Sequence, residues 1–187
     1  SGLQFTARVG GLPSDLFSVV GFKLTERLSE VFQGHLELAS TDPSIQAAEI
    51  LEQPVDLVIW QDSMPLRRFT GVVNEFVRGD AGHRRTRYEL IIQPPLWRLG
   101  LMHNSRIFQT QGTDTIVRTL LEERGIIDSI FDLKRTPEQR EYCVQHRESD
   151  LAFLERLAAE EGWHYRYEQG SVDGDTQSAL IIADHHG

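Results

Sequence analysis

One run of the sequence, from Arg140 to Tyr167, predicts a strand, a capped amphipathic helix and a returning strand. At its start, Tyr142, Val144 and His146 alternate with the residues between them, which is the period-2 pattern of a half-buried strand. Near its end, Gly162 stands where a left-handed residue would stop the helix. No other segment constrains the fold as strongly, because each part of this run has a defined place in the packing.

The predicted helix has a start signal and one apolar face. Ser149 occupies the N-cap position, where its hydroxyl can accept a free backbone N–H, and Asp150 favours the positive end of the helix dipole. The apolar face consists of Leu151, Leu154, Leu157 and Ala158, with Phe153 at its flank. One face of the returning strand carries Trp163, Tyr165 and Tyr167. The run therefore predicts a packing unit without an obvious catalytic set.

The first half of the chain has the alternation and the turn residues of β-structure. The expected strands cover Phe17 to Leu24, Phe32 to Ser40, Val55 to Ile59, Phe69 to Val77 and Thr86 to Gln93. The last two would pair across a loop from Arg78 to Arg85. Asp42 and Pro43 predict the N-cap and first position of a short helix that extends to about Glu52. Short strands joined by tight turns predict a small barrel or a sandwich.

Two consecutive prolines, Pro94 and Pro95, separate this β-rich part from a mixed part, because they cannot continue a central strand. We therefore expect an α+β chain, with a small β-barrel at residues 1–93 and an α/β lobe at residues 94–187. In the lobe, Thr113 is the expected cap of a helix that ends before Gly125. The apolar face of this helix consists of Ile116, Val117, Leu120 and Leu121. The remaining expectations are helical turns over 96–102, a short strand or turn within 126–134, a loop over 168–176 and a last strand over 179–183.

Several segments also resemble a known family. The run REYCVQHRESDLAFLERLAAEEGWHYRY (140–167) is similar to that of VgrG proteins, the spikes of type VI secretion systems, which resemble the central hub of contractile phage tails. Four earlier segments follow the order expected of that hub: FKLTERLSEVFQGHLELASTDP (22–43), RRFTGVV (67–73), YELIIQPPLWRL (88–99) and SRIFQ (105–109). The resemblance covers nearly the whole chain, and none of its pieces is a catalytic motif.

The resemblance implies a fold, partners and a location. In the VgrG family, three hub copies close into a ring that caps a stack of hexamers of the tube protein Hcp. Residues 1–93 should then form a barrel like that of Hcp or a phage tail tube. The implied partners are two further copies of the full-length protein, the Hcp tube, and effector or adaptor proteins. The implied location is the cytoplasm before assembly, followed by secretion through the type VI system into target cells or the medium.

Two other functions stay open at this point. A hub or late-control protein of a contractile phage tail, or of a tail-derived particle, shares the architecture. A cell-wall hydrolase is the alternative enzyme, because some spikes carry fused effector domains, but no catalytic constellation supports it. A spike should continue into a needle with short sequence repeats. Because these 187 residues contain no repeat, we expect them to be a fragment of a longer protein. The expectation is a structural protein and not an enzyme.

Composition excludes some classes of partner and some locations. The net charge of −9, from 19 basic and 28 acidic residues, disfavours nucleic acid, because an acidic surface repels phosphates. No apolar run approaches the roughly 18 residues that indicate a membrane span. Cys143 is the single cysteine, which excludes an intrachain disulfide and agrees with a protein made in the cytosol. Because Cys143 lies inside a strand, we expect it to be a small buried side chain.

A group near the C-terminus resembles a metal site. Asp184, His185 and His186 all offer ligand atoms, but adjacent residues of an extended segment point in opposite directions. Adding His146 or His164 gives no spacing of a known metal motif. We therefore expect a solvated tail and no metal ligand there.

Acid–base roles are conceivable for three carboxylate pairs, Glu122 with Glu123, Glu160 with Glu161, and Glu148 with Asp150. Neighbours in a helix diverge by about 100°, so consecutive glutamates do not face one reaction centre. Since negative charge is unfavourable at a helix C-terminus, one glutamate of the last turn is expected to pair with Arg156 or Arg166. An ion pair is therefore the preferred interpretation of that turn.

Two further groups have structural explanations. Ser149 lies near His146, but the chain has no Gly-x-Ser-x-Gly elbow, and the hydroxyl already has a capping role. The basic cluster from His83 to Arg87 is expected to be a solvated hairpin tip, with an electrostatic contact to an acidic neighbour as the alternative. The sequence thus predicts no catalytic, cofactor-binding or metal-ligating residue.

Overall fold

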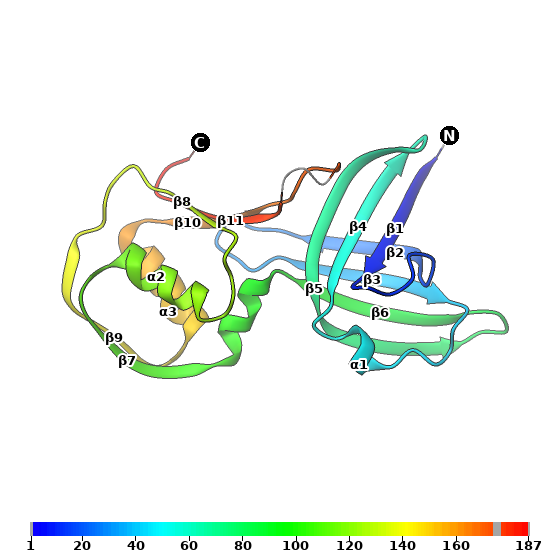
Figure 1. The fold of residues 1–187 in the computed structure, drawn as a ribbon, viewed down its shortest axis with the longest axis horizontal. Coiled ribbons are helices and arrows are strands. Elements are labelled where there is room, and N and C mark those ends of the chain that lie inside the picture. The colour runs from blue at the N-terminus through cyan, green and yellow to red at the C-terminus, as the bar shows by residue number, and fades with distance from the viewer. Residues whose placement is uncertain (1, 174–176, 187) are drawn as a thin grey trace. The chain divides into compact units, whose positions relative to one another are not determined.

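The structure is a computed structural model, and it describes residues 2–173 and 177–186 of the chain. The chain divides into two compact units that are not contiguous in sequence (Figure 1). Unit 1 is built from the described residues of Ser1–Glu26, Phe32–Pro94 and Gln169–Ser178, and unit 2 from those of Arg27–Val31, Pro95–Glu168 and Ala179–Gly187. A division into domains at residues 1–93 and 94–187 stays a prediction. Thr176 and Gly187, which end the expected loop and the expected tail, lie outside the described residues.

Unit 1 is a single antiparallel sheet of six strands that curls strongly (Figure 1). In order across the sheet, its strands are β1 (Leu3–Val9), β4 (Pro54–Gln61), β5 (Met64–Ala81), β6 (Thr86–Gln93), β3 (Gln33–Ser40) and β2 (Ser18–Thr25). Strand β5 has 18 residues, and it pairs with β4 up to Val72 and with β6 from Val72 onward. One bent strand thus belongs to both halves of the sheet and allows it to curl.

The curled sheet is an open half-barrel, because its edge strands β1 and β2 form no ladder with each other in the part of the chain that the structure describes. The two edges meet through side chains instead. The rings of Phe5 and Phe22 pack edge to face, with their centroids 5.2 Å apart. The predicted combination of a β-rich first half with a mixed α/β second half is confirmed. The small closed barrel that was expected is not seen, because the described part of the sheet has this open form.

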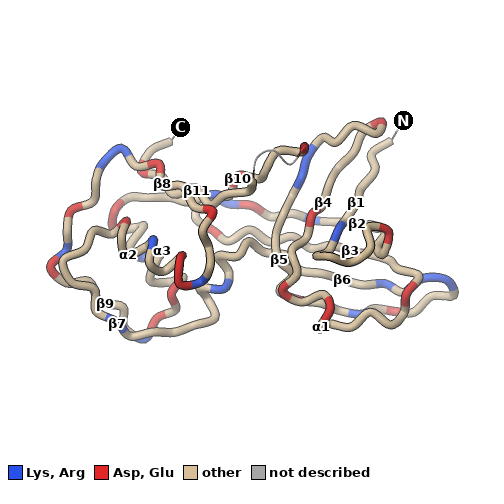
Figure 2. The backbone as a smooth tube through the Cα atoms, viewed as in Figure 1, with Lys and Arg blue, Asp and Glu red and all other residues tan. Residues whose placement is uncertain are grey.

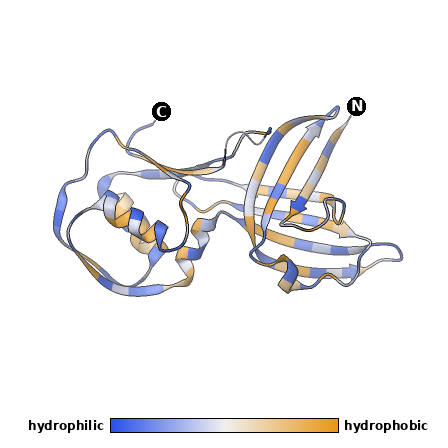
Figure 3. Cartoon of the chain, viewed as in Figure 1, coloured by the Kyte–Doolittle hydropathy of each residue, from blue (hydrophilic) through white to orange (hydrophobic). Residues whose placement is uncertain are grey.

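The core of unit 1 follows from the alternation along its strands, which Figure 3 shows as bands of apolar and polar residues. Fully buried side chains come from β3, β4, β5 and β6, namely Leu36, Leu38, Leu57, Val73, Leu90 and Ile92. Gly34 is needed where β3 passes this core. A Cβ at that position would lie 2.6 Å from Cγ1 of Ile92 and 2.8 Å from Cδ2 of Leu24.

Two expectations for unit 1 are corrected. Strand β1 was not predicted, and the helix expected to start at Asp42 and Pro43 begins later, as the single turn α1 (Ala47–Ile50) with Gln46 as its N-cap. Asp42 instead accepts hydrogen bonds from the backbone N–H and the hydroxyl of Ser44, at 2.8 and 2.6 Å. Because that turn uses the side chain of Asp42 locally, the carboxylate does not cap a helix.

Unit 2 contains two helices and two small sheets (Figure 1). A short 3₁₀ segment η1 (Pro95–Leu101) precedes β7 (His103–Gly112), which pairs antiparallel with β9 (Gln139–Ser149) in a two-stranded ribbon. The second sheet has the order β10 (His164–Glu168), β11 (Ala179–Ala183), β8 (Ser129–Asp132). The helices are α2 (Thr113–Glu122) and α3 (Asp150–Glu161). Within the described residues, no helix is long and apolar enough to cross a membrane.

The core of unit 2 joins both helices to both sheets, and it buries the predicted apolar faces. The end signals of α3 are confirmed: Ser149 accepts a hydrogen bond from the N–H of Ala152 at 3.1 Å, and Gly162 is left-handed with φ 72°. Cys143 is buried as expected. The cap predicted for α2 is wrong by one residue, because Gly112 is the N-cap and Thr113 is the first helical residue.

The apolar stripe of α3 gives a test of this packing. Leu154 is almost fully buried in the core of unit 2. Leu154→Ala should lower the free energy of unfolding by roughly 2–5 kcal/mol, because it removes buried methyl groups and leaves a cavity. Urea denaturation measures the loss, with the exposed Ile130→Ala as the matched control in the same unit. An unchanged midpoint for Leu154→Ala would refute this assignment.

Candidate functional site

The C-terminal residues do not form the expected solvated tail. The side chain of Asp184 is 2% exposed, and its carboxylate accepts the backbone N–H groups of Lys134 and Arg135 at 2.9 and 3.0 Å. These bonds, together with one from His185, lower the pKa of Asp184 to about 2. Asp184 therefore fastens the loop after β8 to the end of β11.

The histidines near this tail do not gather around an ion position. The rings of His164 and His186 stack with their centroids 5.2 Å apart, and burial together with the neighbouring His186 lowers the pKa of His164. Among residues 2–173 and 177–186, no group of three or more His, Cys, Asp or Glu side chains is arranged to hold a metal. His146 lies on β9, opposite Ser105 of β7.

Each of the three carboxylate pairs has at least one member bound by an arginine, and in the first pair Arg106 binds Glu123 at 2.6 Å. Glu160 pairs with Arg156 at 3.1 Å, as one of the two alternatives predicted, and it also contacts Arg140. Glu161 pairs with Arg140 at 2.7 Å, and its carboxylate accepts the hydroxyl of Thr113. The other alternative is wrong, because Arg166 pairs with Glu168 of its own strand. No two of these carboxylates face a common open centre.

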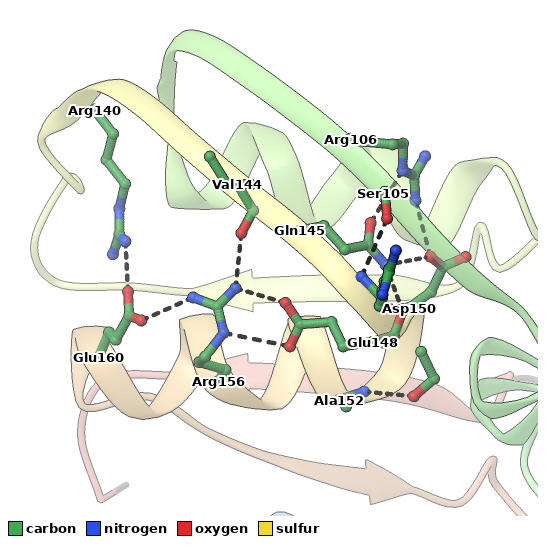
Figure 4. Close-up of polar contacts among 12 residues, drawn as sticks. Ser105, Arg106, Arg140, Val144, Gln145, Glu148, Asp150, Ala152, Arg156 and Glu160 are labelled. Atoms are coloured by element: carbon green, nitrogen blue, oxygen red, sulfur yellow. Dashed lines mark hydrogen bonds and ion pairs between the residues drawn. The ribbon is translucent and has the colours of Figure 1, made fainter.

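Asp150 is fully buried and lies at the centre of a polar cluster, which we call the Asp150 cluster (Figure 4). Its Oδ1 accepts hydrogen bonds from Asn104 Nδ2 at 2.8 Å, Arg106 Nη2 at 2.9 Å and Gln145 Nε2 at 2.8 Å, and its Oδ2 from Arg124 Nη2 at 3.1 Å. Burial alone would raise the pKa of Asp150, but these hydrogen bonds and the charge of Arg106 outweigh it and lower the pKa. The carboxylate therefore stays ionised and joins β7, β9, α3 and the segment after α2.

A second group of ion pairs fixes β9 to the exposed side of α3 (Figure 4). The guanidinium of Arg156 binds the carboxylate of Glu148 at 2.6 Å and donates to the backbone carbonyl of Val144 at 2.9 Å. Its other nitrogen contacts Glu160, which Arg140 also binds. Two arginines and two glutamates thus hold the start, the middle and the end of β9 against α3.

The remaining candidates have ordinary structural environments. The basic cluster lies at the β5–β6 hairpin tip, where the N–H of Gly82 donates to the carbonyl of Arg85 at 2.9 Å. A pocket of about 390 Å³ in unit 1 is lined by residues that include Arg8, Trp60 and Arg68. The indole N–H of Trp60 donates to the hydroxyl of Thr6 at 2.8 Å. In the described part of the chain, neither place brings a nucleophile to a base.

One surface of unit 2 is unusual in its chemistry. The inner face of the β7–β9 ribbon packs on the helices through Phe108, whose ring stacks on Phe153 with centroids 5.8 Å apart. On the outer face, Ile107, Tyr142 and Val144 are between 48% and 64% exposed. A rigid scaffold that presents apolar side chains is typical of a surface that binds another protein. The functional candidate is therefore this outer face, held from behind by the Asp150 cluster.

Comparison with known proteins agrees with an assembly component. Residues 25–187 match the model of the family described as phage tail baseplate hub (GPD). The chain belongs to this family. It is 42% identical to the type VI secretion spike protein VgrG3 of Vibrio cholerae over 174 residues, which are 88% of this chain and 17% of the relative. It is 41% identical to VgrG2a of Pseudomonas aeruginosa over 169 residues, or 89% of this chain and 20% of that protein. The predicted resemblance to VgrG proteins is confirmed.

A solved structure shows the same fold in a related protein. The E. coli c3393 protein, described as a component of the type VI secretion system with structural similarity to the T4 tail proteins gp27 and gp5, superposes with a TM-score of 0.84 at 27% identity. The match covers 95% of this chain and 48% of that chain. The chain thus spans less than half of each of these proteins.

The residues of the Asp150 cluster were not predicted to meet. Asn104 and Arg106 are 46 and 44 residues from Asp150 in sequence. The sequence placed Asp150 at the start of a helix and in a possible carboxylate pair with Glu148, but it did not indicate Gln145 as the buried partner. A usable signal was present, because Gln145 occupies an inward position of an alternating strand and needs a partner there.

Removing the charge of Asp150 should weaken unit 2 strongly. Asp150→Asn removes the buried carboxylate that two arginines share, which should cost about 3–5 kcal/mol of unfolding free energy. The matched control is Glu148→Gln, whose partner Arg156 is partly exposed and which should cost about 1 kcal/mol or less. Urea denaturation followed by circular dichroism compares them. Equal losses would contradict the central place given to Asp150.

Acid should destabilise unit 2. Hydrogen bonds from arginines lower the pKa values of Glu148 and Glu160, and the pKa of Asp150 is lowered as described. The ordinary pKa is 4.5 for Glu and 3.8 for Asp, and the folded protein holds all three groups below these values. Above about pH 4.5 the ionised carboxylates therefore stabilise the fold, and this contribution is lost as the pH falls further.

The Trp60→Phe variant restricts tryptophan fluorescence to Trp97 and Trp163, which both belong to unit 2. Its denaturation midpoint in urea should be lower at about pH 3.5 than at about pH 6. The fall should be smaller when Asp150→Asn is added. A midpoint that does not change with pH would refute the role of these ion pairs.

Proposed function

We propose that this chain is part of the hub of a type VI secretion spike, where it has a structural function. The observation that carries the proposal is the 42% identity to a VgrG spike protein across 88% of the chain, which includes both units. Two features of the structure support it. The conspicuous charged residues of unit 2 are engaged in ion pairs that join secondary structure elements, and an apolar face is left exposed.

In this proposal, residues 1–93 and 94–187 are the two hub domains, and three copies assemble into a ring that caps the Hcp tube. The curled sheet of unit 1 supports a barrel of the tube type, in which the seam between β1 and β2 is closed within the ring. Effector or adaptor proteins are further partners. The protein is made in the cytoplasm and leaves the cell with the expelled tube.

The charge distribution agrees with protein partners. Figure 2 shows acidic and basic residues interspersed along both units, in a chain with a net charge of −9. Interspersed charges of this kind differ from the clustered Lys and Arg residues that bind a phosphate backbone. Nucleic acid is therefore not among the proposed partners.

The alternative function is the hub of a contractile phage tail. The name of the matched family favours it, since this family is described from phage tail baseplates. The relatives with 41% and 42% identity are type VI spike proteins, and they support the secretion system more directly. A cell-wall hydrolase finds no support in the arrangement of the described side chains.

The assembly can be tested on the longest natural protein that contains this chain. We expect light scattering after gel filtration to give a trimer, and we expect the trimer to cosediment with Hcp tubes. Deleting the gene should stop the release of Hcp into the medium, and supplying it again should restore release. A monomeric protein that leaves Hcp release unchanged would contradict the spike, whereas loss of phage-like particles would identify a tail hub.

A further inference from the structure

The pocket of about 390 Å³ in unit 1, which we call the Trp60 pocket, lies on the outer face of the curled sheet. Its strand residues come from β1, β4 and β5, which are neighbours in the sheet (Figure 1). Leu57 belongs to the core of unit 1, so the residues on either side of it, Asp56 and Val58, point to the opposite face. Thr6 lies opposite Val58, and Arg8 lies opposite Asp56. The alternation of the strands therefore brings these four side chains together outside the core.

Two of the three charged side chains in the Trp60 pocket neutralise each other. Nε of Arg68 donates to Oδ1 of Asp56 at 2.9 Å, and Nη2 of Arg68 lies 2.8 Å from the same oxygen. Arg8 is the third, and it is exposed and forms no ion pair with any residue that the structure describes. The pocket therefore keeps one uncompensated positive charge, although the chain as a whole has a net charge of −9.

An aromatic ring lines the same pocket at some distance from this charge. Trp60 is half-buried, and its indole N–H donates to the hydroxyl of Thr6 at 2.8 Å, so the ring is held in place and its only donor is occupied. Asp56, which lies opposite Arg8, precedes Trp60 by four residues on β4, or about 13 Å of extended backbone. The pocket thus presents a positive charge and an aromatic ring at a fixed spacing along one strand face.

We propose that the Trp60 pocket binds an acidic peptide segment of another protein. A guanidinium matches a carboxylate in charge and in the arrangement of its donors, so Arg8 binds an Asp or Glu side chain of the peptide. Trp60 packs against an aromatic side chain four residues away in the peptide, because residues i and i+4 of an extended chain lie on one face and span the same distance. This inference goes beyond the proposed hub assembly, since it assigns a ligand to a site within unit 1 and needs no second copy.

The lining residues favour a carboxylate over a phosphate. None of them belongs to a helix, so the pocket offers no helix N-terminus to a phosphate group. The single charge of a carboxylate is balanced by the one uncompensated arginine. Acidic groups elsewhere on the chain do not cancel this attraction, because exposed charges are largely screened beyond about 8 Å at physiological ionic strength.

The probe is the peptide acetyl-Glu-Ser-Ala-Ser-Phe-amide, made in both directions of its sequence and added to the longest natural protein that contains this chain. Saturation-transfer NMR observes the signals of the peptide, so it suits a large protein and weak binding. The ring protons of Phe should receive the strongest saturation. The matched peptide with Gln in place of Glu should bind about tenfold more weakly, because it loses a charged hydrogen bond. The peptide with Ala in place of Phe should bind about fivefold more weakly, because it loses the ring contact.

Variants of Arg8 assign the carboxylate to its partner. Arg8→Gln should weaken binding of the Glu peptide about tenfold and leave that of the Gln peptide unchanged, because only the first forms the charged contact. Arg8→Lys keeps the charge and should restore most of the binding. Arg84→Gln is the matched control, at an exposed arginine of the same unit outside the pocket, and it should change neither peptide. Since Arg8 is exposed, its variants should keep the urea midpoint of the unchanged protein.

Two results would overturn the inference. One is equal binding of the Glu and Gln peptides to the unchanged protein, and the other is an equal effect of Arg8→Gln and Arg84→Gln on the Glu peptide. The trimer and the release of Hcp test the proposed hub separately. A protein that forms the trimer but binds neither peptide would therefore refute the ligand of the Trp60 pocket alone.

Discussion

The carboxylate of Asp150 accepts hydrogen bonds from four side chains that belong to β7, β9 and the segment after α2. Taking this charge out of water is costly, and the cost is offset only when all of these donors are in place. This buried group therefore ties the ribbon to the start of α3. Because the loss of a single donor leaves a charge without a full set of partners, partly formed arrangements are disfavoured and unit 2 is held in one geometry.

The other charged residues of unit 2 extend this constraint to its surface. Arg156 and Arg140 bind Glu148, Glu160 and Glu161, and so they join β9 to α3 where these elements meet solvent. In an enzyme, such carboxylates and arginines would converge on a cavity. Here they are used between secondary structure elements. These ion pairs thus hold the strands and helices of unit 2 together.

The sequence predicted those features that depend only on neighbouring residues, such as helix caps and strand alternation. Ser149 and Gly162 define the ends of α3 because capping needs only neighbouring residues, and the buried position of Cys143 follows from the alternation of its strand. Strand β1 was also within reach of the same reasoning, since Leu3, Phe5 and Ala7 alternate with polar residues. The start of α1 was wrong because a turn at Asp42 competes locally for the same carboxylate.

Long-range contacts were not predictable in the same way. The partners of Asp150 lie on other elements, and no spacing in the sequence indicates that they meet. The open form of the curled sheet is likewise a property of the pairing between six strands, in which β5 pairs with two neighbours in turn. The resemblance to VgrG proteins supplied the expected family, while the partners of Asp150 and the double pairing of β5 came only from the structure.

Hydrogen exchange at single-residue resolution tests the central claim most directly, because it measures which elements open together. If the buried carboxylate joins ribbon and helix into one body, the amides of β7, β9 and α3 should exchange slowly and with one common opening free energy. A ribbon whose amides exchange quickly while α3 stays protected would contradict this account.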